Sequence, residues 1–418
     1  MTTAPHATLT RYMLALGAHF AAGGVMSVAF PWIITYLLHE SDARVGLAQF
    51  IATLPLMCFV LIGGANADGR NLRVYISRLQ LGTAVLPIVL ATVAALHMLS
   101  FGWTVTVVFA ISTLSAFIMP ARDALLSHVS PPSLGLARTA ALATAATFGG
   151  QAFGLVLAGA AALFGVVPLL CLQSILLVFA AVMTAGLRYE MAPAPPITER
   201  ERLSRLWHEL RDGVRVVRDS ERLRTLILYL SLGSPLFNGM FLVGVPLMVR
   251  DVYHLNARSL AFVMVAFLVG LTVSSFSFSH MRPVERPGRL LMLLSPNNIL
   301  VFAIAHFAPP FPFFVGLMLW WGLISGVAMS LTRGMIQVAA PNAYRARVLS
   351  VLQFANIAGS PPGALLFGLV SQAVGILNTL LIVPVVVAIL WIAFRFFSPL
   401  WEFKREDGLH EAAIPAAN

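Results

Sequence analysis

The chain has 418 residues, of which 59% are hydrophobic and only 11% are charged, and its formal net charge is +10. Soluble domains carry roughly 45–50% apolar and about 25% charged residues, so this composition excludes a set of soluble domains. The apolar runs are continuous and do not alternate. This excludes a membrane β-barrel and predicts an all-α polytopic membrane protein.

Windows of about twenty apolar residues predict twelve transmembrane helices. In chain order they lie near 12–38, 45–66, 74–96, 103–121, 139–163, 166–187, 226–249, 259–280, 290–307, 311–332, 348–373 and 376–397. The predicted organisation is an N-terminal six-helix bundle in 1–188, a cytoplasmic linker in 189–225, a C-terminal six-helix bundle in 226–397 and a cytoplasmic tail in 398–418.

The basic residues lie almost entirely on one side of these spans. If the loops alternate between the two sides, one set of loops holds only Arg44, Arg250 and Arg258 among the 27 Lys and Arg. Because basic loops stay cytoplasmic, both termini of this multi-pass protein are predicted to be cytoplasmic. The expected location is the inner (plasma) membrane. The positive charge then reflects topology, and no nucleic-acid partner is predicted.

The sequence contains an internal duplication. Residues that follow span four recur after span ten, at separations of 209 to 211 residues, and half of the chain is 209 residues. The matched pairs are Arg122 with Arg333, Pro131 with Pro341, Gly154 with Gly363, Gly159 with Gly368, and Gly165 with Gly375. Two repeated six-span halves are typical of secondary transporters, in which the substrate binds near the midplane between the halves.

The linker between the halves is the longest polar segment. Its "APAPP" stretch (192–196) predicts an extended spacer. Hydrophobic residues then recur at helical spacing from Leu203 to Val217, with Arg on the other faces, which predicts an amphipathic helix at the cytoplasmic interface. A passive tether is the simpler interpretation of this helix, and a regulatory partner site is the alternative.

Twelve spans, two halves, a long middle loop and a charged turn after span two resemble the major facilitator superfamily, whose signature in this turn reads G-x-x-x-D-R-x-G-R-R/K. Gly64, Asp68 and Arg73 match its first glycine, its acid and its last base. The positions that depart from it are Gly69, Asn71 and Leu72, and Arg70 offers a base one step late. The resemblance covers nearly the whole chain and implies two pseudo-symmetric six-helix bundles.

Three further segments are similar to the efflux branch of that family, which includes macrolide, siderophore and lysophospholipid exporters. They are the arginine-containing turn after span four, "ELRDGVRVVRD" (209–219) and "RARVLS" before span eleven.

The charged turn after span two is a candidate cytoplasmic gate made of Gly64, Asp68, Arg70 and Arg73, with Arg122 and Asp123 after span four. Asp68 can accept hydrogen bonds from N–H groups at a neighbouring helix start, which the helix dipole favours. Arg70 and Arg73 can pair with Asp123. The resemblance implies that such contacts latch the outward-open state. The alternative is solvated charge that only sets the topology.

Span five carries three glycines four and five residues apart, namely Gly150, Gly154 and Gly159, which let another helix approach closely. Similar exporters have a glycine–proline step here, where this chain has Leu155 and Ala158. The match to that antiporter signature is partial, and helix packing explains the glycines equally well.

No Asp or Glu lies at a predicted bilayer centre, so the chain offers few buried charges for a highly charged substrate. An amphipathic substrate needs only aromatic surface and a few hydrogen-bonding groups. Candidates for these groups lie on spans one, five, seven, ten and eleven, which line the cavity in similar carriers, although each could also serve ordinary packing. They are Phe20, Gly24, Ser27, Thr147, Gln151, Asn238, Phe241, Trp320 with Trp321 beside it, Phe354 and Asn356.

The source of energy is open at this stage. Proton coupling is the family expectation, and Asp68, Asp123 or His19 in span one could titrate, although a lone histidine is more often a hydrogen-bonded core residue. Uncoupled transport is the alternative. A G-x-x-x-x-G-K-[ST] loop cannot occur because Lys404 is the only lysine, so ATP is not expected to drive the protein directly. No cofactor or metal is predicted.

The sequence therefore predicts a monomeric secondary carrier that exports small amphipathic molecules, such as a drug, siderophore or metabolite, with lipid, substrate and protons as partners. A lipid flippase of the same fold is the first alternative. A membrane-embedded enzyme is the second, but the histidines have no paired acids or Ser-His pattern that would support catalysis. A receptor or structural protein would leave the duplication unexplained.

Overall fold

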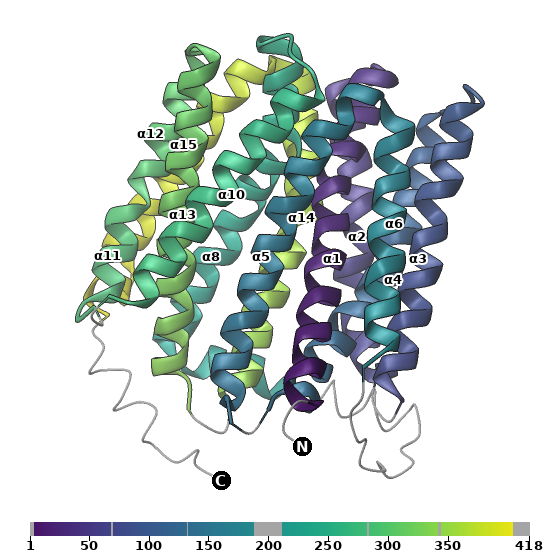
Figure 1. Ribbon diagram of the computed structural model, residues 1–418. Helices are drawn as coiled ribbons and strands as arrows, with labels where there is room; N and C mark the ends of the chain where they lie inside the picture. The colour runs from purple at the N-terminus through teal and green to yellow at the C-terminus, as the bar shows by residue number, and fades with distance from the viewer. Residues whose placement is uncertain are drawn as a thin grey trace. The chain divides into compact units, whose positions relative to one another are not determined.

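The computed structural model describes residues 4–67, 70–131, 133–187, 211–281, 284–341 and 344–403. These ranges are helical and contain no strand (Figure 1). Within them, twelve helices are long and apolar enough to cross a membrane. The all-α fold class and the twelve predicted spans are therefore confirmed.

The first six spans comprise α1 (Ala4–Trp32) with its π-helical continuation η1 (Ile33–Leu37), α2 (Asp42–Ala67), α3 (Leu72–Ala95), α4 (Phe101–Val129), α5 (Gly135–Ala161) with the 3-10 turn η2 (Ala162–Phe164), and α6 (Val166–Ala185). Residues 211–219 of the linker are also helical.

The second six spans begin with α8 (Glu221–Gly239), which continues through η3 (Met240–Gly244), α9 (Val245–Leu247) and η4 (Met248–Val252). They go on with α10 (Ala257–Ser279), α11 (Pro287–Leu294) and α12 (Pro296–His306) in one span, α13 (Phe311–Ala339), α14 (Arg345–Val374) and α15 (Ile376–Phe397), followed by the 3-10 turn η5 (Pro399–Glu402).

The chain divides into two compact units. Unit 1 consists of Met1–Glu40, Ile51–Leu206 and Leu255–Val265, and unit 2 consists of Ser41–Phe50, Trp207–His254 and Ala266–Asn418. The units thus follow the two halves of the sequence, except that the first turns of α2 belong to unit 2 and the first turns of α10 belong to unit 1.

The helices of spans four and ten continue well past the predicted ends of these spans. The apolar spacing of α4 continues through Ala121, Leu125 and Val129, which are all buried, so the helix runs on for two turns past the predicted end of the span. α13 likewise continues to Ala339. Arg122, Asp123 and Arg333 therefore lie on helices, and the turn expected after span four begins later than predicted.

Repeated glycines set the close helix crossings within each unit. In unit 1, a Cβ at Gly154 of α5 would collide with the backbone of Ala21 on α1. In unit 2, a Cβ at the repeat-related Gly363 of α14 would collide with the backbone of Pro235 on α8. Because lipid gives helices no hydrophobic reason to associate, such backbone contact supplies the van der Waals attraction that holds the pair.

The turns that follow these two helices are also repeated. Gly165 precedes α6 with φ of 101°, and Gly375 precedes α15 with φ of 84°. Residues with a side chain rarely adopt this conformation, so glycine is needed where the chain reverses into spans six and twelve.

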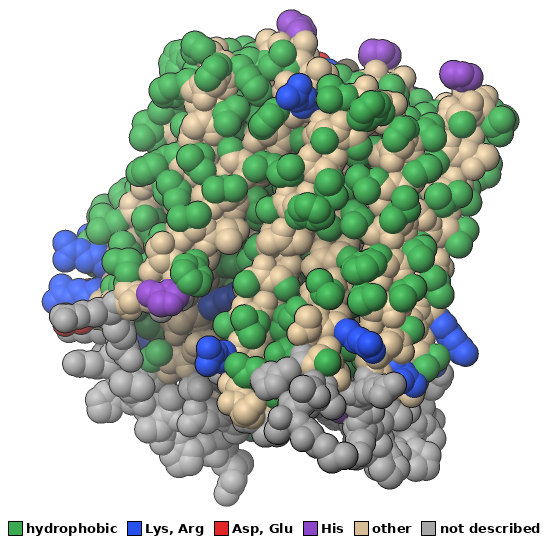
Figure 2. Space-filling view, in the orientation of Figure 1, with side chains coloured by type: hydrophobic (Ala, Val, Ile, Leu, Met, Phe, Trp, Pro, Cys, Tyr) green, Lys and Arg blue, Asp and Glu red, His purple; other side chains and the backbone are tan. Residues whose placement is uncertain are grey.

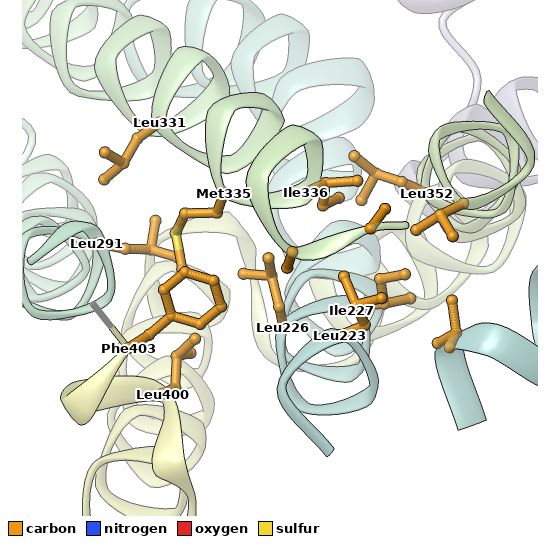
Figure 3. Close-up of a cluster of buried hydrophobic side chains, with 14 of the residues drawn as sticks. Leu223, Leu226, Ile227, Leu291, Leu331, Met335, Ile336, Leu352, Leu400 and Phe403 are labelled. Carbon is orange, nitrogen blue, oxygen red and sulfur yellow. The ribbon is translucent and has the colours of Figure 1, made fainter. Parts of the chain in front are cut away.

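Unit 2 has a buried hydrophobic cluster that ties the linker and the C-terminal segment to the spans (Figure 3). Val217 of the linker helix and Phe403 after η5 are buried in it, and η5 also contributes Leu400. The linker helix packs on α14 through Asp212, whose Oδ2 lies 2.9 Å from Arg347 Nη1. The described part of the predicted amphipathic helix is therefore anchored to protein through Val217, while Val214 is exposed.

The face of the molecule in Figure 2 is covered by hydrophobic side chains along the middle of the helices, and most of the visible Lys and Arg lie near helix ends. This distribution is typical of a protein whose helices are surrounded by lipid.

The glycine crossing can be tested with two glycines of the same helix. We expect Gly154→Ala to destabilise unit 1 by about 1–3 kcal/mol, because the added methyl group forces the α1 and α5 backbones apart. Gly149→Ala is the matched control, since no atom lies within 4 Å of a Cβ at Gly149. Thermal unfolding of the purified variants measures the difference. Equal midpoints for the two variants would contradict the assigned role of Gly154.

Candidate functional site

Unit 2 contains a cavity of about 540 Å³ that we call the unit-2 cavity. Binding sites for small molecules typically measure roughly 300–1,000 Å³, so the volume suits a small organic ligand. Its wall is made by α8, η3, α10, α11, α12, α13 and α14. The lining residues are Leu230, Phe237, Asn238, Phe241, Phe267, Leu291, Leu294, Ser295, Asn298, Trp321, Ile324, Ser325, Ala328, Met329, Thr332, Arg333, Leu352, Gln353, Asn356, Ile357 and Ser360.

One face of α13 provides the longest part of this wall. Its lining positions, from Trp321 to Arg333, recur every three or four residues and so share one face of the helix. At a rise of about 1.5 Å per residue, Trp321 and Arg333 lie about 18 Å apart along the helix. The cavity is therefore elongated along α13.

The Trp321 end of the cavity is aromatic. The ring of Phe267 lies 4.8 Å from the rings of both Phe241 and Trp321, between their centroids. Trp321 is only 2% exposed, and its Nε1–H donates to Asn298 Oδ1 at 3.1 Å. This hydrogen bond and the packed rings fix the orientation of the indole, so this end offers a rigid apolar surface.

Polar side chains form the part of the wall between α8 and α14. Asn238 Nδ2 donates to Ser234 Oγ at 2.9 Å, and Ser234 Oγ donates to the carbonyl of Asn356 at 3.0 Å. On α11 and α12, Ser295 Oγ accepts from the hydroxyl of Tyr229. Asn238 and Asn356 thus add polar residues to this part of the cavity wall.

Unit 1 has a small pocket of about 10 Å³, whose lining combines apolar side chains with Tyr12, His19, Gln80 and Arg122. The guanidinium of Arg122 lies 4.6 Å from the centre of the Phe20 ring, and the Tyr12 hydroxyl donates to the Arg122 carbonyl at 3.1 Å. The ring of His19 makes an edge contact with Phe20, at 5.7 Å between centroids. The pocket is far smaller than the unit-2 cavity and has no room for a drug-sized ligand.

Some of the predicted cavity residues of the C-terminal half line the unit-2 cavity, and others point away from it. Asn238, Phe241 and Asn356 line the unit-2 cavity. Trp321 lines it in place of Trp320, because neighbouring residues of a helix point about 100° apart, and Trp320 is 48% exposed away from it. Phe354 is also off the lining face of α14, for the same reason of helical phase.

The predicted cavity residues of the N-terminal half mainly make helix contacts. A Cβ at Gly24 would collide with the backbone carbonyl of Gln151, so α1 and α5 touch at this point and leave no space for a ligand. Ser27 Oγ donates to the Gly24 carbonyl at 2.7 Å. Phe20 is covered by Arg122, and Thr147 is half-buried on α5.

The glycines of span five also have distinct neighbours. Gly150 lies against the backbone of Gly17 on α1, one turn before the crossing at Gly154. A Cβ at Gly159 would lie 3.3 Å from the Cβ of Ala261, in the first turns of α10 that belong to unit 1.

The candidate cytoplasmic gate is only partly described, because Asp68 lies outside the described residues. Arg73 Nη1 donates to the carbonyl of Leu187 at 3.0 Å, and Arg70 lies 5.3 Å from the centre of the Tyr75 ring. Gly64 faces Pro120, whose Cβ would be 3.7 Å from an added Cβ.

Asp123 pairs with its neighbour Arg122 at 3.4 Å. Among the described residues, the predicted pairing of Arg70 or Arg73 with Asp123 is therefore not present. Since Asp123 lies within α4 and not in the turn after it, its carboxylate is held beside the arginine of its own helix.

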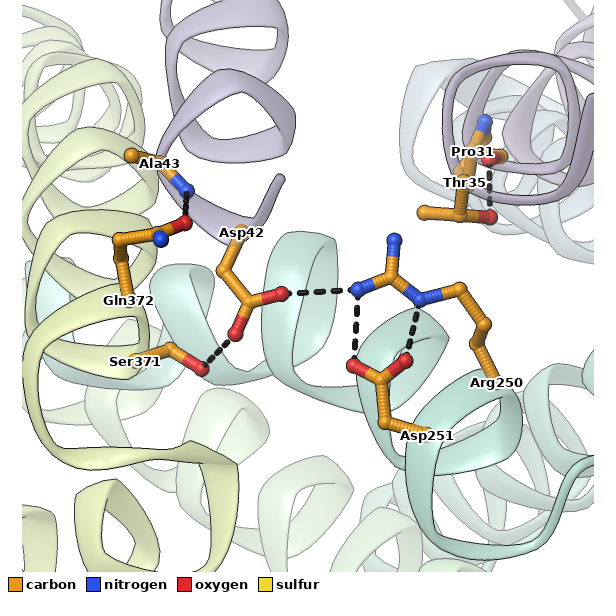
Figure 4. Close-up of polar contacts among 8 residues, drawn as sticks. All are labelled: Pro31, Thr35, Asp42, Ala43, Arg250, Asp251, Ser371 and Gln372. Atoms are coloured by element: carbon orange, nitrogen blue, oxygen red, sulfur yellow. Dashed lines mark hydrogen bonds and ion pairs between the residues drawn. The ribbon is translucent and has the colours of Figure 1, made fainter. Parts of the chain in front are cut away.

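Sequence reasoning missed a polar network in unit 2 that we call the Asp42 network (Figure 4). Arg250 Nη2 lies 2.8 Å from Asp42 Oδ1 and 2.8 Å from Asp251 Oδ2, and Arg250 Nε also donates to Asp251. Asp42 Oδ2 accepts from Ser371 Oγ at 2.6 Å. The side chains of Asp42 and Arg250 are each only 17% exposed, so the pair is largely shielded from solvent.

The Asp42 network lies beside a close helix contact. A Cβ at Gly46 of α2 would lie 2.7 Å from the Ala364 carbonyl oxygen and 2.9 Å from the Cα of Gly368 on α14. The contact and the network together fix the first turns of α2 within unit 2. Gly368 thus corresponds to Gly159, which makes the equivalent contact with the start of α10 in unit 1.

The fold and the cavity define a polytopic helical carrier built from two repeated halves. The model of the Major Facilitator Superfamily matches residues 12–364, and the chain therefore belongs to this family. It is accordingly a membrane transporter and not an enzyme.

Similar proteins agree with this assignment. The chain is 26% identical over 415 residues to the multidrug efflux pump Tap of Mycolicibacterium fortuitum, covering 96% of this chain and 98% of the pump. It is 24% identical over 142 residues to the enterobactin exporter EntS of Shigella flexneri, covering 33% and 35% of the two chains. The crystal structure of the nucleoside transporter NupG has the same fold, with a TM-score of 0.75 at 14% identity over 95% of this chain and 100% of that one.

The Asp42 network can be tested through the first turns of α2. We expect Asp42→Asn to weaken their attachment by about 1–3 kcal/mol, because Arg250 and Ser371 lose a charged partner in a largely buried position. Hydrogen exchange of the amides in residues 42–50 should then become faster. Asp219→Asn is the control, since it removes an exposed carboxylate from the same unit. Unchanged exchange in 42–50 would show that the network does not hold this segment.

Proposed function

We propose that this transporter exports small amphipathic organic molecules across the plasma membrane by alternating access, with both termini in the cytoplasm. The observation that carries the proposal is the unit-2 cavity, which combines a rigid aromatic end with amide and hydroxyl groups. Such a surface suits ligands that bury a ring and keep one polar group hydrogen-bonded. The names of the relatives, a multidrug efflux pump and an enterobactin exporter, support export over uptake.

Alternating access needs rigid helix pairs and contacts that can open. The backbone crossings of α1 with α5 and of α8 with α14 supply the rigid pairs, since Gly154 and Gly363 leave no slack between the helices. The Asp42 network supplies a candidate for the reversible contact. It consists of ion pairs and hydrogen bonds, which water can replace when the segment moves away.

The proposed topology rests on the distribution of basic residues. In the topology with cytoplasmic termini, only three arginines (Arg44, Arg250, Arg258) face the outside, and Arg250 is neutralised by Asp42 and Asp251. The outer side then carries only three of the 27 Lys and Arg, which agrees with the positive-inside rule. Labelling of tags on both termini in intact cells and after permeabilisation tests this arrangement.

The cavity assignment predicts a contrast between two adjacent tryptophans. We expect Trp321→Ala to reduce export of the neutral dye N-phenyl-1-naphthylamine at least tenfold, because it removes a large part of the aromatic end. Trp320→Ala should change export less than twofold, since Trp320 lies outside the cavity wall. Dye accumulation in efflux-deficient cells with matched expression measures both variants.

Trp321→Phe distinguishes loss of the ring from loss of the fold, because it keeps an aromatic side chain. Equal export by Trp321→Ala and the wild type would contradict the cavity assignment. Scrambling of labelled phospholipid in vesicles, without dye transport, would favour the lipid flippase instead.

We also propose that export is coupled to protons, with His19 as the titrating group within the first span. His19 lines the small pocket of unit 1 together with Arg122 and Tyr12, so a proton on His19 would change the charge balance of this pocket. We expect an imposed pH gradient to accelerate dye uptake into inside-out vesicles. His19→Gln should abolish the acceleration and keep gradient-independent exchange.

His306→Gln is the control for this experiment, because His306 is bonded to the Leu377 carbonyl at 2.8 Å and lies outside this pocket. Identical uptake with and without the gradient in the wild type would exclude proton antiport. A gradient effect that persists in His19→Gln would instead remove His19 from the coupling.

A further inference from the structure

The unit-2 cavity has one charged residue among the described residues that line it, and this residue is Arg333. Arg333 is exposed on the lining face of α13, about three turns from Trp321. With a rise of about 1.5 Å per residue, the guanidinium end and the indole end are separated by about 18 Å along the helix. The cavity is therefore amphipathic along its length.

No carboxylate in the described part of the chain pairs with Arg333. The described acids of unit 2 that form ion pairs have other partners. Asp42 and Asp251 pair with Arg250, Asp212 pairs with Arg347, and Asp219 pairs with Arg215 and Arg218. An arginine within a membrane-spanning helix is costly unless water or a counter-charge reaches it. Since Arg333 borders a cavity, water or a ligand can reach it there.

The internal repeat shows that Arg333 lacks a carboxylate that its counterpart in the first half has. Arg122 is the counterpart of Arg333 in the first half, and it is followed by Asp123, with which it pairs at 3.4 Å. Arg122 also stacks on Phe20. Arg333 is followed by Gly334, so the second half keeps the arginine and lacks the neighbouring carboxylate. The positive charge of Arg333 is thus available to a ligand.

We propose that the unit-2 cavity selects amphipathic molecules that carry an aromatic ring and a single anionic group, with the ring at Trp321 and the anion on Arg333. The guanidinium presents its N–H donors as a planar fork that matches a carboxylate or sulfonate. Gln353, on the facing part of α14, adds an amide to the same wall. A cationic ligand finds no carboxylate among the described lining residues and is repelled by Arg333.

This selectivity rests on the proposed function in one respect, namely that the unit-2 cavity is the transport site. It refines the sequence-based expectation that a highly charged substrate is disfavoured, since one arginine can balance one negative charge. It also separates charge recognition, at Arg333, from recognition of the ring, at Trp321.

The experiment uses three probes with the same dansyl ring and chains of similar length. They are N-dansyl-6-aminohexanoate, which is anionic, N-hexyl dansylamide, which is neutral, and dansylcadaverine, which is cationic. Binding to the full-length protein in phosphatidylcholine nanodiscs is measured from dansyl fluorescence, with empty nanodiscs subtracted. We expect the anionic probe to bind most tightly and the cationic probe most weakly.

Arg333→Gln should weaken binding of the anionic probe about tenfold or more, because a hydrogen-bonded charge pair is lost. The neutral probe should change less than twofold, and Arg333→Lys should give an intermediate loss. Arg215→Gln is the matched control, since it removes an exposed arginine of the same unit that does not line the cavity. Trp321→Ala should weaken the binding of all three probes, because all three carry the dansyl ring.

Equal binding of the anionic probe by Arg333→Gln and the wild type would overturn the proposal, as would tighter binding of the cationic probe by the wild type. Failure of the wild type to bind any of the three probes would contradict the proposal that the cavity binds amphipathic molecules with an aromatic ring. The assay measures binding without transport. Intact charge selectivity in a protein that does not export would therefore contradict only the proposed function.

Discussion

Backbone contact between helices at repeated glycines is the constraint on which the rest of this structure depends. In lipid, apolar side chains gain nothing by leaving the solvent, so helix pairs are held by close packing. Gly154 against Ala21 and Gly363 against Pro235 provide that packing once in each half. One further turn and a half along the same helices, Gly159 and Gly368 receive the first turns of α10 and α2. The spacing of glycines along two helices therefore fixes four helix contacts.

The two halves keep this framework and differ in what they enclose. In unit 1 the contact of Gly24 with α5 closes the space near the predicted cavity residues, and Arg122 is stacked on Phe20 beside its own Asp123. In unit 2 the corresponding helices surround a cavity of about 540 Å³. Duplication thus preserved the glycines, which packing requires, while the side chains at the centre of each half diverged.

The sequence predicts those features that depend on local composition and on spacing within one helix. Spans are set by runs of apolar residues, and the repeated glycines are visible as one common offset. The helical phase of a cavity wall is harder to predict, because Trp320 and Trp321 have the same chemistry and only packing decides which one faces inward. The Asp42 network was missed because Asp42 and Arg250 are 208 residues apart. The available signal was that Asp42 and Arg250 each lie at a span end on the same predicted side.

Three arginines at the predicted ends of membrane spans show how the protein accommodates a positive charge there. Arg250 is largely buried and is held by two carboxylates, as a buried cation must be if it is not to destabilise the fold. Arg122 has one carboxylate and an aromatic face. Arg333 has neither among the described residues, and it is the one of the three that borders a large cavity. A cation without a fixed partner is stable in such a position only if water or a ligand can reach it. Arg333 is exposed, so water can reach it, and the proposed anionic ligand would supply the counter-charge that the second half lacks.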